Sequence, residues 1–296
     1  MIKTPAESQF SEDLNPYFQV RIPDHLECLP PRARRNYGRN HVHPLWSATT
    51  LESHSRFNDQ VDRHEKLEIY SIDPYYHITH RRKQFTFAFL SRKNGRTQTG
   101  ESWWEYSHAK RLEVDPEVAD YQLGGFRITW RTSHGIREYT PDAVRVDTAG
   151  AIAADEVKAS ASYFHEPEYS AQMKRTNIDL AAAGICFNMI DGEQMLSNRR
   201  YFYNVAKAFD DRFAKFGDRE LDQIHNVIRD NDAGVELGRI ANAMQLHAAS
   251  AMQIVNAMMC KGLVVYDLNY PANLDTIVRL FPKLATPLPD IRSIQI

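Results

Sequence analysis

The sequence has few cysteines and no long hydrophobic run. Its three cysteines are far apart and lack Cys-x-x-Cys spacing: Cys28, Cys186 and Cys260. This pattern argues against a disulfide framework and against a zinc site, and it is typical of a reducing compartment. The sequence contains no run of 18 apolar residues, so it predicts no transmembrane helix. The first residues, MIKTPAESQFSEDLNP, lack the apolar segment of a secretory signal. We therefore expect a cytoplasmic protein without a membrane partner.

Several motifs of common enzyme classes are also absent. The chain contains no Walker A, G-x-G-x-x-G or G-x-S-x-G pattern, so nucleotide-driven and acyl-transfer chemistry lack support. His41 and His43 have a spacing that could bind zinc, but no third ligand follows. We interpret the histidines as polar loop residues. The tryptophans are expected to pack a core rather than stack on bases: Trp103, Trp104 and Trp130.

The charge of the chain is unevenly distributed. The composition, 43% hydrophobic and 25% charged with a net charge of −2, is that of an ordinary globular protein. Residues 30–111 carry 15 Lys and Arg against 8 Asp and Glu, whereas residues 217–296 carry 7 against 9. A polyanionic partner should therefore contact the first half. The segment PPRARRNYGRN at 30–40 fits a solvated loop or a phosphate-contacting arm equally well. A second basic cluster surrounds an aromatic run: Arg81, Arg82, Lys83, Arg92, Lys93 and Arg96.

The periodicity of apolar residues predicts a mixed α/β fold in three parts. Residues 1–60 form an N-terminal arm with the basic loop, residues 61–216 an α/β domain, and residues 217–296 a smaller domain. In the α/β domain a helix is expected at 102–112, strands at 121–131 and 137–158, a helix at 167–183, a buried strand at 184–190 and a helix at 192–213. This order predicts a mixed sheet flanked by helices.

The C-terminal part, residues 217–296, has the pattern of a winged helix. Helices are expected at 219–229, with Asp218 as N-cap, and at 235–245 and 248–261, followed by strands at 263–268 and 274–281. The third helix, AASAMQIVNAMMC, carries no base-reading arginine and offers only Gln253 and Asn256. Its surplus methionines favour protein docking over DNA reading.

A charged hairpin is predicted within REYTPDAVRVDTAGAIAADEVKAS, residues 137–160. Two strand-like runs flank Asp147–Gly150, which is the pattern of a β-hairpin. Glu156 and Lys158 share one strand face, and Asp142 should lie beside them across the hairpin. Two neighbouring carboxylates repel each other unless a cation lies between them, and such oxygen ligands suit Mg²⁺ or Mn²⁺. The alternative is a solvated hairpin with a Glu156–Lys158 ion pair.

A fourth candidate, Glu105, lies on the helix at 102–112. Ser102 and Glu105 match a capping box, which is a structural role. Glu105 also falls on one stripe with Ala109 and Leu112, which is expected to face the interior. A carboxylate on that stripe needs a partner there.

Four segments cover much of residues 85–210: SRKNGRTQTGESWWEYSHAKRLEVDPEV, YTPDAVRV, ADEVKA and MKRTNIDLAAAGICFNMI. Together they resemble the TnsA-type endonuclease subunits of heteromeric transposons, which belong to the PD-(D/E)xK restriction-endonuclease-like superfamily. The segment DYQLGGFRI (120–128) departs from the family pattern, which leaves the local strand geometry open. The resemblance implies a restriction-endonuclease-like mixed sheet in residues 61–216, followed by a winged helix.

The resemblance also implies a function and a set of site residues. Glu105, Asp142 and Glu156 would be catalytic acids and Lys158 the catalytic lysine, with the Val157 carbonyl as a further metal ligand. The cofactor would be Mg²⁺, with Mn²⁺ as a substitute, and the reaction would cut one strand of DNA at the transposon ends. The implied partners are a DDE transposase and an AAA+ regulator that docks on the C-terminal domain. Two alternatives stay open: a stand-alone restriction-like or repair nuclease, and an inactive DNA-binding assembly factor.

Overall fold

The structure is a computed structural model that describes residues 49–52, 66–71, 85–132, 135–229, 231 and 233–282. The chain divides into two compact units, residues 1–39 and 40–296, and every described residue belongs to the second. Several predicted features lie outside the described residues: most of the N-terminal arm, the loop at 30–40, His41, His43, Arg81, Arg82 and Lys83.

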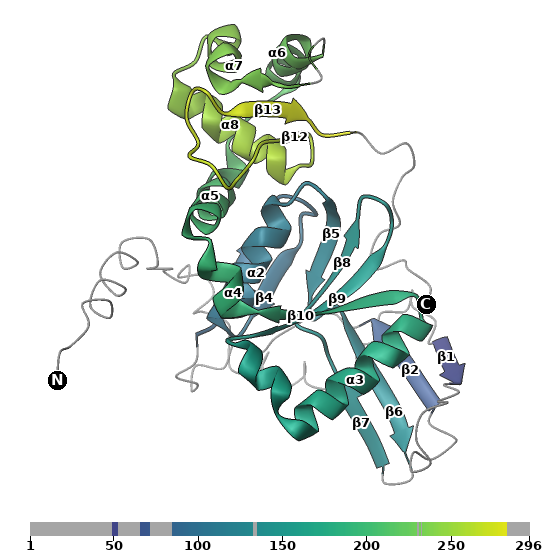
Figure 1. The fold of residues 1–296 in the computed structure, drawn as a ribbon. Helices are drawn as coiled ribbons and strands as arrows, with labels where there is room; N and C mark the ends of the chain where they lie inside the picture. Colours follow the sequence, from purple (N-terminus) through teal and green to yellow (C-terminus); the bar gives the residue numbers. More distant parts are fainter. Residues whose placement is uncertain are drawn as a thin grey trace, which may run out of the picture. The chain divides into compact units, whose positions relative to one another are not determined.

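A four-stranded mixed sheet positions the candidate site. Its strand order is β10-β9-β8-β5, and β10 pairs parallel to β9 while the other two pairs are antiparallel. A parallel pair needs a crossover, which here runs through the short helix η3 and the long helix α3 (Figure 1). The bounds are β5 (Val118–Leu123), β8 (Ala143–Asp147), β9 (Ile152–Lys158), β10 (Ile185–Asp191), η3 (Ala161–His165) and α3 (Pro167–Ala182).

Two further sheets are formed by strands that precede β8 in the sequence. A fully antiparallel sheet has the order β1-β2-β6-β7, and a two-stranded hairpin joins β3 to β4. The bounds are β1 (Thr49–Glu52), β2 (Lys66–Ser71), β3 (Phe87–Leu90), β4 (Thr97–Gly100), β6 (Phe126–Thr132) and β7 (Gly135–Tyr139).

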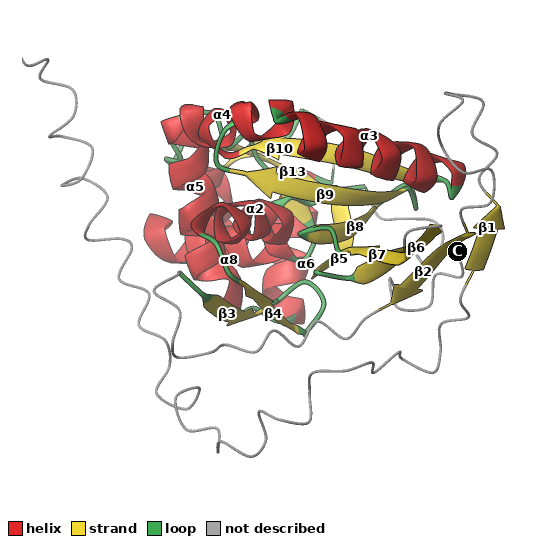
Figure 2. Cartoon of the chain, turned by 90° about the horizontal axis from the view of Figure 1, so that it is seen from below, coloured by secondary structure: helices red, strands yellow, loops and turns green. Residues whose placement is uncertain are grey.

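Helices cover both faces of the mixed sheet. Helix α2 (Trp103–Val114) contacts β5 and β9, and α3 contacts β10; Figure 2 shows the two helices on opposite sides of these strands. Side chains alternate along β9, so Ala154 packs with Met173 and Leu180 of α3, whereas Asp155 meets His108 of α2. Helices α4 (Gly192–Ser197) and α5 (Arg199–Asp210) and the short η4 (Asp211–Phe213) follow.

The C-terminal elements are three helices and a small sheet of order β11-β13-β12 (Figure 1). Gln245 ends α7 in the left-handed conformation, with φ at 56°, and His247 caps the next helix by accepting a hydrogen bond from the Ala249 amide (3.3 Å). The bounds are α6 (Asp218–Ile228), β11 (Val235–Glu236), α7 (Leu237–Met244), α8 (Ala248–Cys260), β12 (Val264–Val265) and β13 (Ile277–Leu280).

One hydrophobic core is shared by elements before residue 217 and elements after it. It runs without interruption from Phe87 of β3 through α2, α5 and α8 to Val278 of β13. The expected boundary at residue 217 stays a prediction, but removing residues 217–296 would expose apolar side chains of α2 and α5 to water. In the part of the chain that the structure describes, no helix combines the length and apolar character needed to cross a membrane.

Several expected elements differ from those observed. The strand expected at 121–131 is two strands in different sheets, because the chain turns at Gly124 (φ +61°). The helix expected at 192–213 breaks at Asn198, whose side chain caps α5. Strand β10 is an edge strand with one buried residue, Ile185, and not a buried strand. Gly217, not Asp218, is the N-cap of α6.

Helix α8 packs most of its apolar residues into the core. Its apolar residues Ile254, Val255, Met258 and Met259 are buried in the core. Asn256 is buried too and hydrogen-bonds to Asp211. Met258 and Met259 therefore pack against α2, α5 and α7, whereas Met252 is only partly buried against the same core. The protein-docking role of this helix stays a prediction.

Candidate active site

The β8–β9 hairpin brings Asp142 to the end of β9, as predicted. Ala143 pairs with Asp155 in the antiparallel register, and Asp147 closes the turn by accepting hydrogen bonds from two turn amides. Immediately before β8, Asp142 accepts a hydrogen bond at Oδ2 from the Val157 amide, 2.7 Å away. The backbone of β9 thus fixes the Asp142 carboxylate.

Glu156 and Lys158 meet Asp142 at this position. The Nζ atom of Lys158 lies 2.5 Å from Oε1 of Glu156 and 3.8 Å from Oδ2 of Asp142. The ammonium therefore stands between two carboxylates, where a cation reduces their repulsion. The Glu156 side chain is 5% exposed, whereas Lys158 is 29% exposed, so the pair is open to solvent on the lysine side.

Two tyrosines that sequence reasoning missed also contact Glu156. The Tyr139 hydroxyl donates to Oε2 at 2.5 Å, and the Tyr169 hydroxyl donates to Oε1. Burial, followed by the nearby Glu156 carboxylate, raises the pKa of Tyr139, and the pKa of Tyr169 is raised by burial and by its hydrogen bond to Glu156. Both phenols therefore keep their protons and act as donors.

Glu105 lies in the first turn of α2, next to the strand β4. The Ser102 hydroxyl accepts a hydrogen bond from the Glu105 amide (3.0 Å), and the Glu105 carboxylate accepts one from the Glu101 amide (3.1 Å). Only half of the predicted capping box forms. A Cβ atom on Gly100 would lie 2.7 Å from Oε2 of Glu105, so this close approach requires glycine.

The stripe on which Glu105 lies faces the interior as predicted. Ala109 and Leu112 are buried, at 0% and 4% exposure, and Glu105 is half-buried. A second close approach closes the same end of the sheet: a Cβ atom on Gly192 would lie 2.4 Å from the Trp104 ring and 2.9 Å from the Lys158 carbonyl oxygen.

The three carboxylates interact electrostatically. Burial raises the pKa of Asp142 to about 8, and the charges of Glu156 and Glu105 add to this effect while Lys158 opposes it. Burial also raises the pKa of Glu105, and its hydrogen bonds to Ser102 and Glu101, followed by the charge of Lys158, partly offset the rise. For Lys158, burial lowers the pKa, but Asp142 and Glu156 outweigh it and the net pKa is raised. Lys158 is therefore a stable cation and not a proton acceptor.

The donor set suits a hard divalent ion. Carboxylate oxygens and a backbone carbonyl are the ligands that Mg²⁺ and Mn²⁺ prefer. Beyond the effect of burial, the charges of Glu156 and Glu105 raise the pKa of Asp142, and a cation stabilises acids that repel one another in this way. Within the described ranges, no group of three or more His, Cys, Asp or Glu side chains is already arranged around a common point as metal ligands. The Lys158 ammonium is the cation that bridges Asp142 and Glu156.

A buried polar network behind β9 was also missed from the sequence. Asp155 has 0% exposure and lies 2.9 Å from Nε2 of His108 and 3.1 Å from Nε of Arg145, while Asn188 donates to it at 2.7 Å. Burial alone would raise the pKa of Asp155, but His108 and the other donors override it and lower the pKa. The sequence signal for this network was Asp155 itself, a charged residue among the small apolar residues of β9. The network connects α2, β8 and β10 to the strand that carries Glu156.

The basic cluster is partly built into the fold. Arg96 pairs with Asp120 and donates to the Tyr121 carbonyl, and Nζ of Lys93 donates to the Asp115 carbonyl (2.9 Å). The Arg92 guanidinium lies 5.8 Å from the centre of the Phe216 ring. Contacts of Arg92, Lys93 and Arg96 with DNA phosphates stay a prediction. The intramolecular partners of these side chains would compete with phosphate for them.

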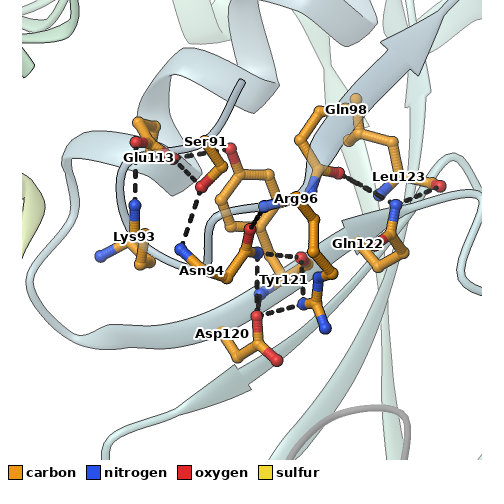
Figure 3. A network of polar contacts seen from close by, with 10 residues as sticks. All are labelled: Ser91, Lys93, Asn94, Arg96, Gln98, Glu113, Asp120, Tyr121, Gln122 and Leu123. Carbon is orange, nitrogen blue, oxygen red and sulfur yellow. Dashed lines mark hydrogen bonds and ion pairs between the residues drawn. The ribbon is translucent and has the colours of Figure 1, made fainter. Parts of the chain in front are cut away.

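The surrounding segment, residues 91–96, closes around the buried carboxylate of Glu113 (Figure 3). Glu113 accepts hydrogen bonds from the Ser91 hydroxyl (2.6 Å), the Tyr121 hydroxyl (2.8 Å) and the amides of Arg92 (2.6 Å) and Lys93 (3.2 Å). Residues 91–96 thus form a structural loop around Glu113.

Comparison with known proteins adds no family. The chain matches no protein-family model, and no curated protein is similar to it in sequence.

Proposed function

We propose that the protein is a Mg²⁺-dependent DNA endonuclease subunit that cuts one strand at each end of a transposon. The observation that carries this proposal is the convergence of Asp142 and Glu156 on the Lys158 ammonium, with Glu105 close enough to shift the pKa of Asp142. The proposal includes a restriction-endonuclease-like sheet in β5-β8-β9-β10 and a winged helix in residues 217–296, inside the observed α/β class.

The roles of the residues follow from their charges and positions. Asp142, Glu156, the Val157 carbonyl and Glu105 would hold the divalent ion. When bound, such an ion lowers the pKa of water and neutralises charge on the phosphate. Lys158 keeps its proton, so it donates a hydrogen bond to the attacking water or to a phosphate oxygen and stabilises the negative charge of the transition state. Val157 also orients Asp142 through its amide.

The partner assignments belong to the same proposal. A DDE transposase would cut the other strand, and an AAA+ regulator would dock on residues 217–296. The apolar residues Ile254, Val255, Met258 and Met259 of α8 are buried in the core, which leaves its exposed residues and the other elements of that region to make the contact. We place the protein in the cytoplasm.

The test is cleavage of labelled transposon-end DNA with and without the transposase. We expect slow, poorly specific nicking by the chain alone and efficient nicking at defined ends when the transposase is present. Rapid, site-specific double-strand cutting by the lone chain would overturn this proposal in favour of the restriction-like nuclease. DNA binding without Mg²⁺-dependent cutting under any of these conditions would favour the inactive assembly factor.

A further inference from the structure

The Glu156 carboxylate is held at both of its oxygen atoms by tyrosines from two different elements. Tyr139 is the last residue of β7 and donates to Oε2, while Tyr169 lies in the first turn of α3 and donates to Oε1. Lys158, two residues further along β9, bonds to Oε1 as well. Three elements of the fold therefore converge on one side chain.

Packing fixes both phenol rings. Tyr139 is 8% exposed and its ring meets Phe187 edge-on, with 6.4 Å between ring centroids. The ring of Tyr169 stacks on Phe164 at 6.2 Å. Rings held in this way have little freedom, so their hydroxyls fix the plane and direction of the carboxylate that accepts from them.

The Tyr169 ring also contacts the lysine of the site. Nζ of Lys158 lies 5.5 Å from the ring centroid, within the range of a cation–π attraction. One side chain thus touches both Glu156, through its hydroxyl, and Lys158, through its ring.

We propose that Tyr139 and Tyr169 are positioning residues that orient Glu156 to receive the divalent ion, and that Tyr169 additionally sets the position of Lys158. This inference rests on the proposed function. A carboxylate offers about four acceptor positions. Two tyrosines and Lys158 fill three of them, so an ion binds at the remaining position or at the one that Lys158 leaves. The tyrosines decide where those positions point.

Such hydrogen bonds to metal ligands have measurable effects. Removing a group that orients a ligand generally costs 10- to 100-fold in metal affinity or activity. If a tyrosine is purely structural, its removal lowers the stability of the protein but leaves metal affinity unchanged. The two roles are therefore separable by experiment.

The chain supplies a matched control in Tyr121. Its hydroxyl donates at 2.8 Å to the buried carboxylate of Glu113, and the residue has no exposed surface. Tyr121→Phe therefore removes the same kind of hydrogen bond from a buried carboxylate that is not part of the candidate site.

The experiment measures Mn²⁺ binding by calorimetry on the full chain for wild type, Y139F, Y169F, Y121F and E156A, together with thermal unfolding without metal. We expect about 10-fold weaker Mn²⁺ binding for Y139F and for Y169F, wild-type binding for Y121F, and loss of the site in E156A. Wild-type affinity in folded Y139F and Y169F, with binding still lost in E156A, would overturn this inference and leave the proposed function standing. Unchanged binding in E156A, or no binding by the wild type, would overturn both.

A second comparison separates the hydroxyl of Tyr169 from its ring. Y169F keeps the ring over Lys158, whereas Y169L removes it. At saturating Mn²⁺ we expect Y169F to nick DNA close to the wild-type rate and Y169L to nick about 10-fold more slowly. Equal nicking rates for Y169F and Y169L at saturating metal would overturn the role of Tyr169 in placing Lys158.

Discussion

The two ends of α2 carry carboxylates, one half-buried and one buried, in opposite electrostatic settings. At the C-terminal end, four donors converge on Glu113 alone. At the N-terminal end, Glu105 lies with two other acids that share Lys158, and the pKa values of Glu105 and Asp142 are raised. A carboxylate surrounded by donors stabilises the fold, whereas acids that compete for one cation leave negative charge for a ligand to neutralise. The difference separates a structural centre from the candidate binding site.

The largest effect is expected at the structural centre. Glu113→Ala leaves the donors of Ser91, Tyr121 and two amides without their acceptor in a buried place, so the free energy of unfolding should fall by about 3 kcal/mol or more. Denaturant unfolding measures this loss. The Mn²⁺ affinity of the folded fraction should stay at the wild-type value, and loss of binding in folded protein would contradict the separation of the two centres.

A smaller loss is expected behind the site. Asp155→Asn removes the charge that His108 and Arg145 contact, and the free energy of unfolding should fall by about 2 kcal/mol at pH 7. Because the pKa of Asp155 is lowered in the folded state from its usual 3.8, its contribution is present above pH 3.8 and disappears as the pH falls through the folded-state pKa. Unfolding curves of both proteins should therefore converge in acid. A gap between them that stays constant down to pH 2 would contradict this account.

At the site itself, removing a charge should stabilise the metal-free protein. The pKa of Asp142 is raised from 3.8 to about 8, so the folded state binds more protons than the unfolded state between these values. Stability without metal should fall as the pH rises through this window. Asp142→Asn should flatten that slope and be more stable than wild type by about 1 kcal/mol at pH 8.

Unfolding between pH 5 and pH 9 in a metal chelator measures this slope. Glu117→Gln is the control, because it removes an exposed acid and should leave the slope unchanged. If Asp142→Asn keeps the wild-type dependence of stability on pH, the raised pKa of Asp142 is not its cause.

The smallest effect is expected in the basic loop. Arg96→Gln breaks the partly exposed pair with Asp120 and should lower the free energy of unfolding by about 0.5–1 kcal/mol. Because the Arg96 guanidinium has inward partners, the salt dependence of DNA binding should change little. A decrease of about one unit in the salt slope would instead return Arg96 to the phosphate-contacting residues expected from the sequence.

The sequence predicted the parts of the site that depend on local periodicity. Strand alternation and a short turn placed Glu156, Lys158 and Asp142 together, and helical periodicity placed Glu105 on the inward face. The tyrosine contacts could not be predicted, because Tyr139 ends a strand of another sheet and Tyr169 lies on the crossover helix. The roles of α8 and of residues 91–96 were missed for the same reason: tertiary packing, not local pattern, decides which methionines and arginines turn inward.

The central claim is tested most directly by the nicking of supercoiled plasmid DNA by the purified chain, with Mg²⁺ and with a chelator. The proposal predicts slow nicking that requires Mg²⁺, is lost at least 100-fold in Asp142→Ala and in Lys158→Ala, and persists in Tyr121→Phe. Nicking that is independent of Mg²⁺, or that continues at the wild-type rate in folded Asp142→Ala, would contradict the claim that these residues form the active site of an endonuclease.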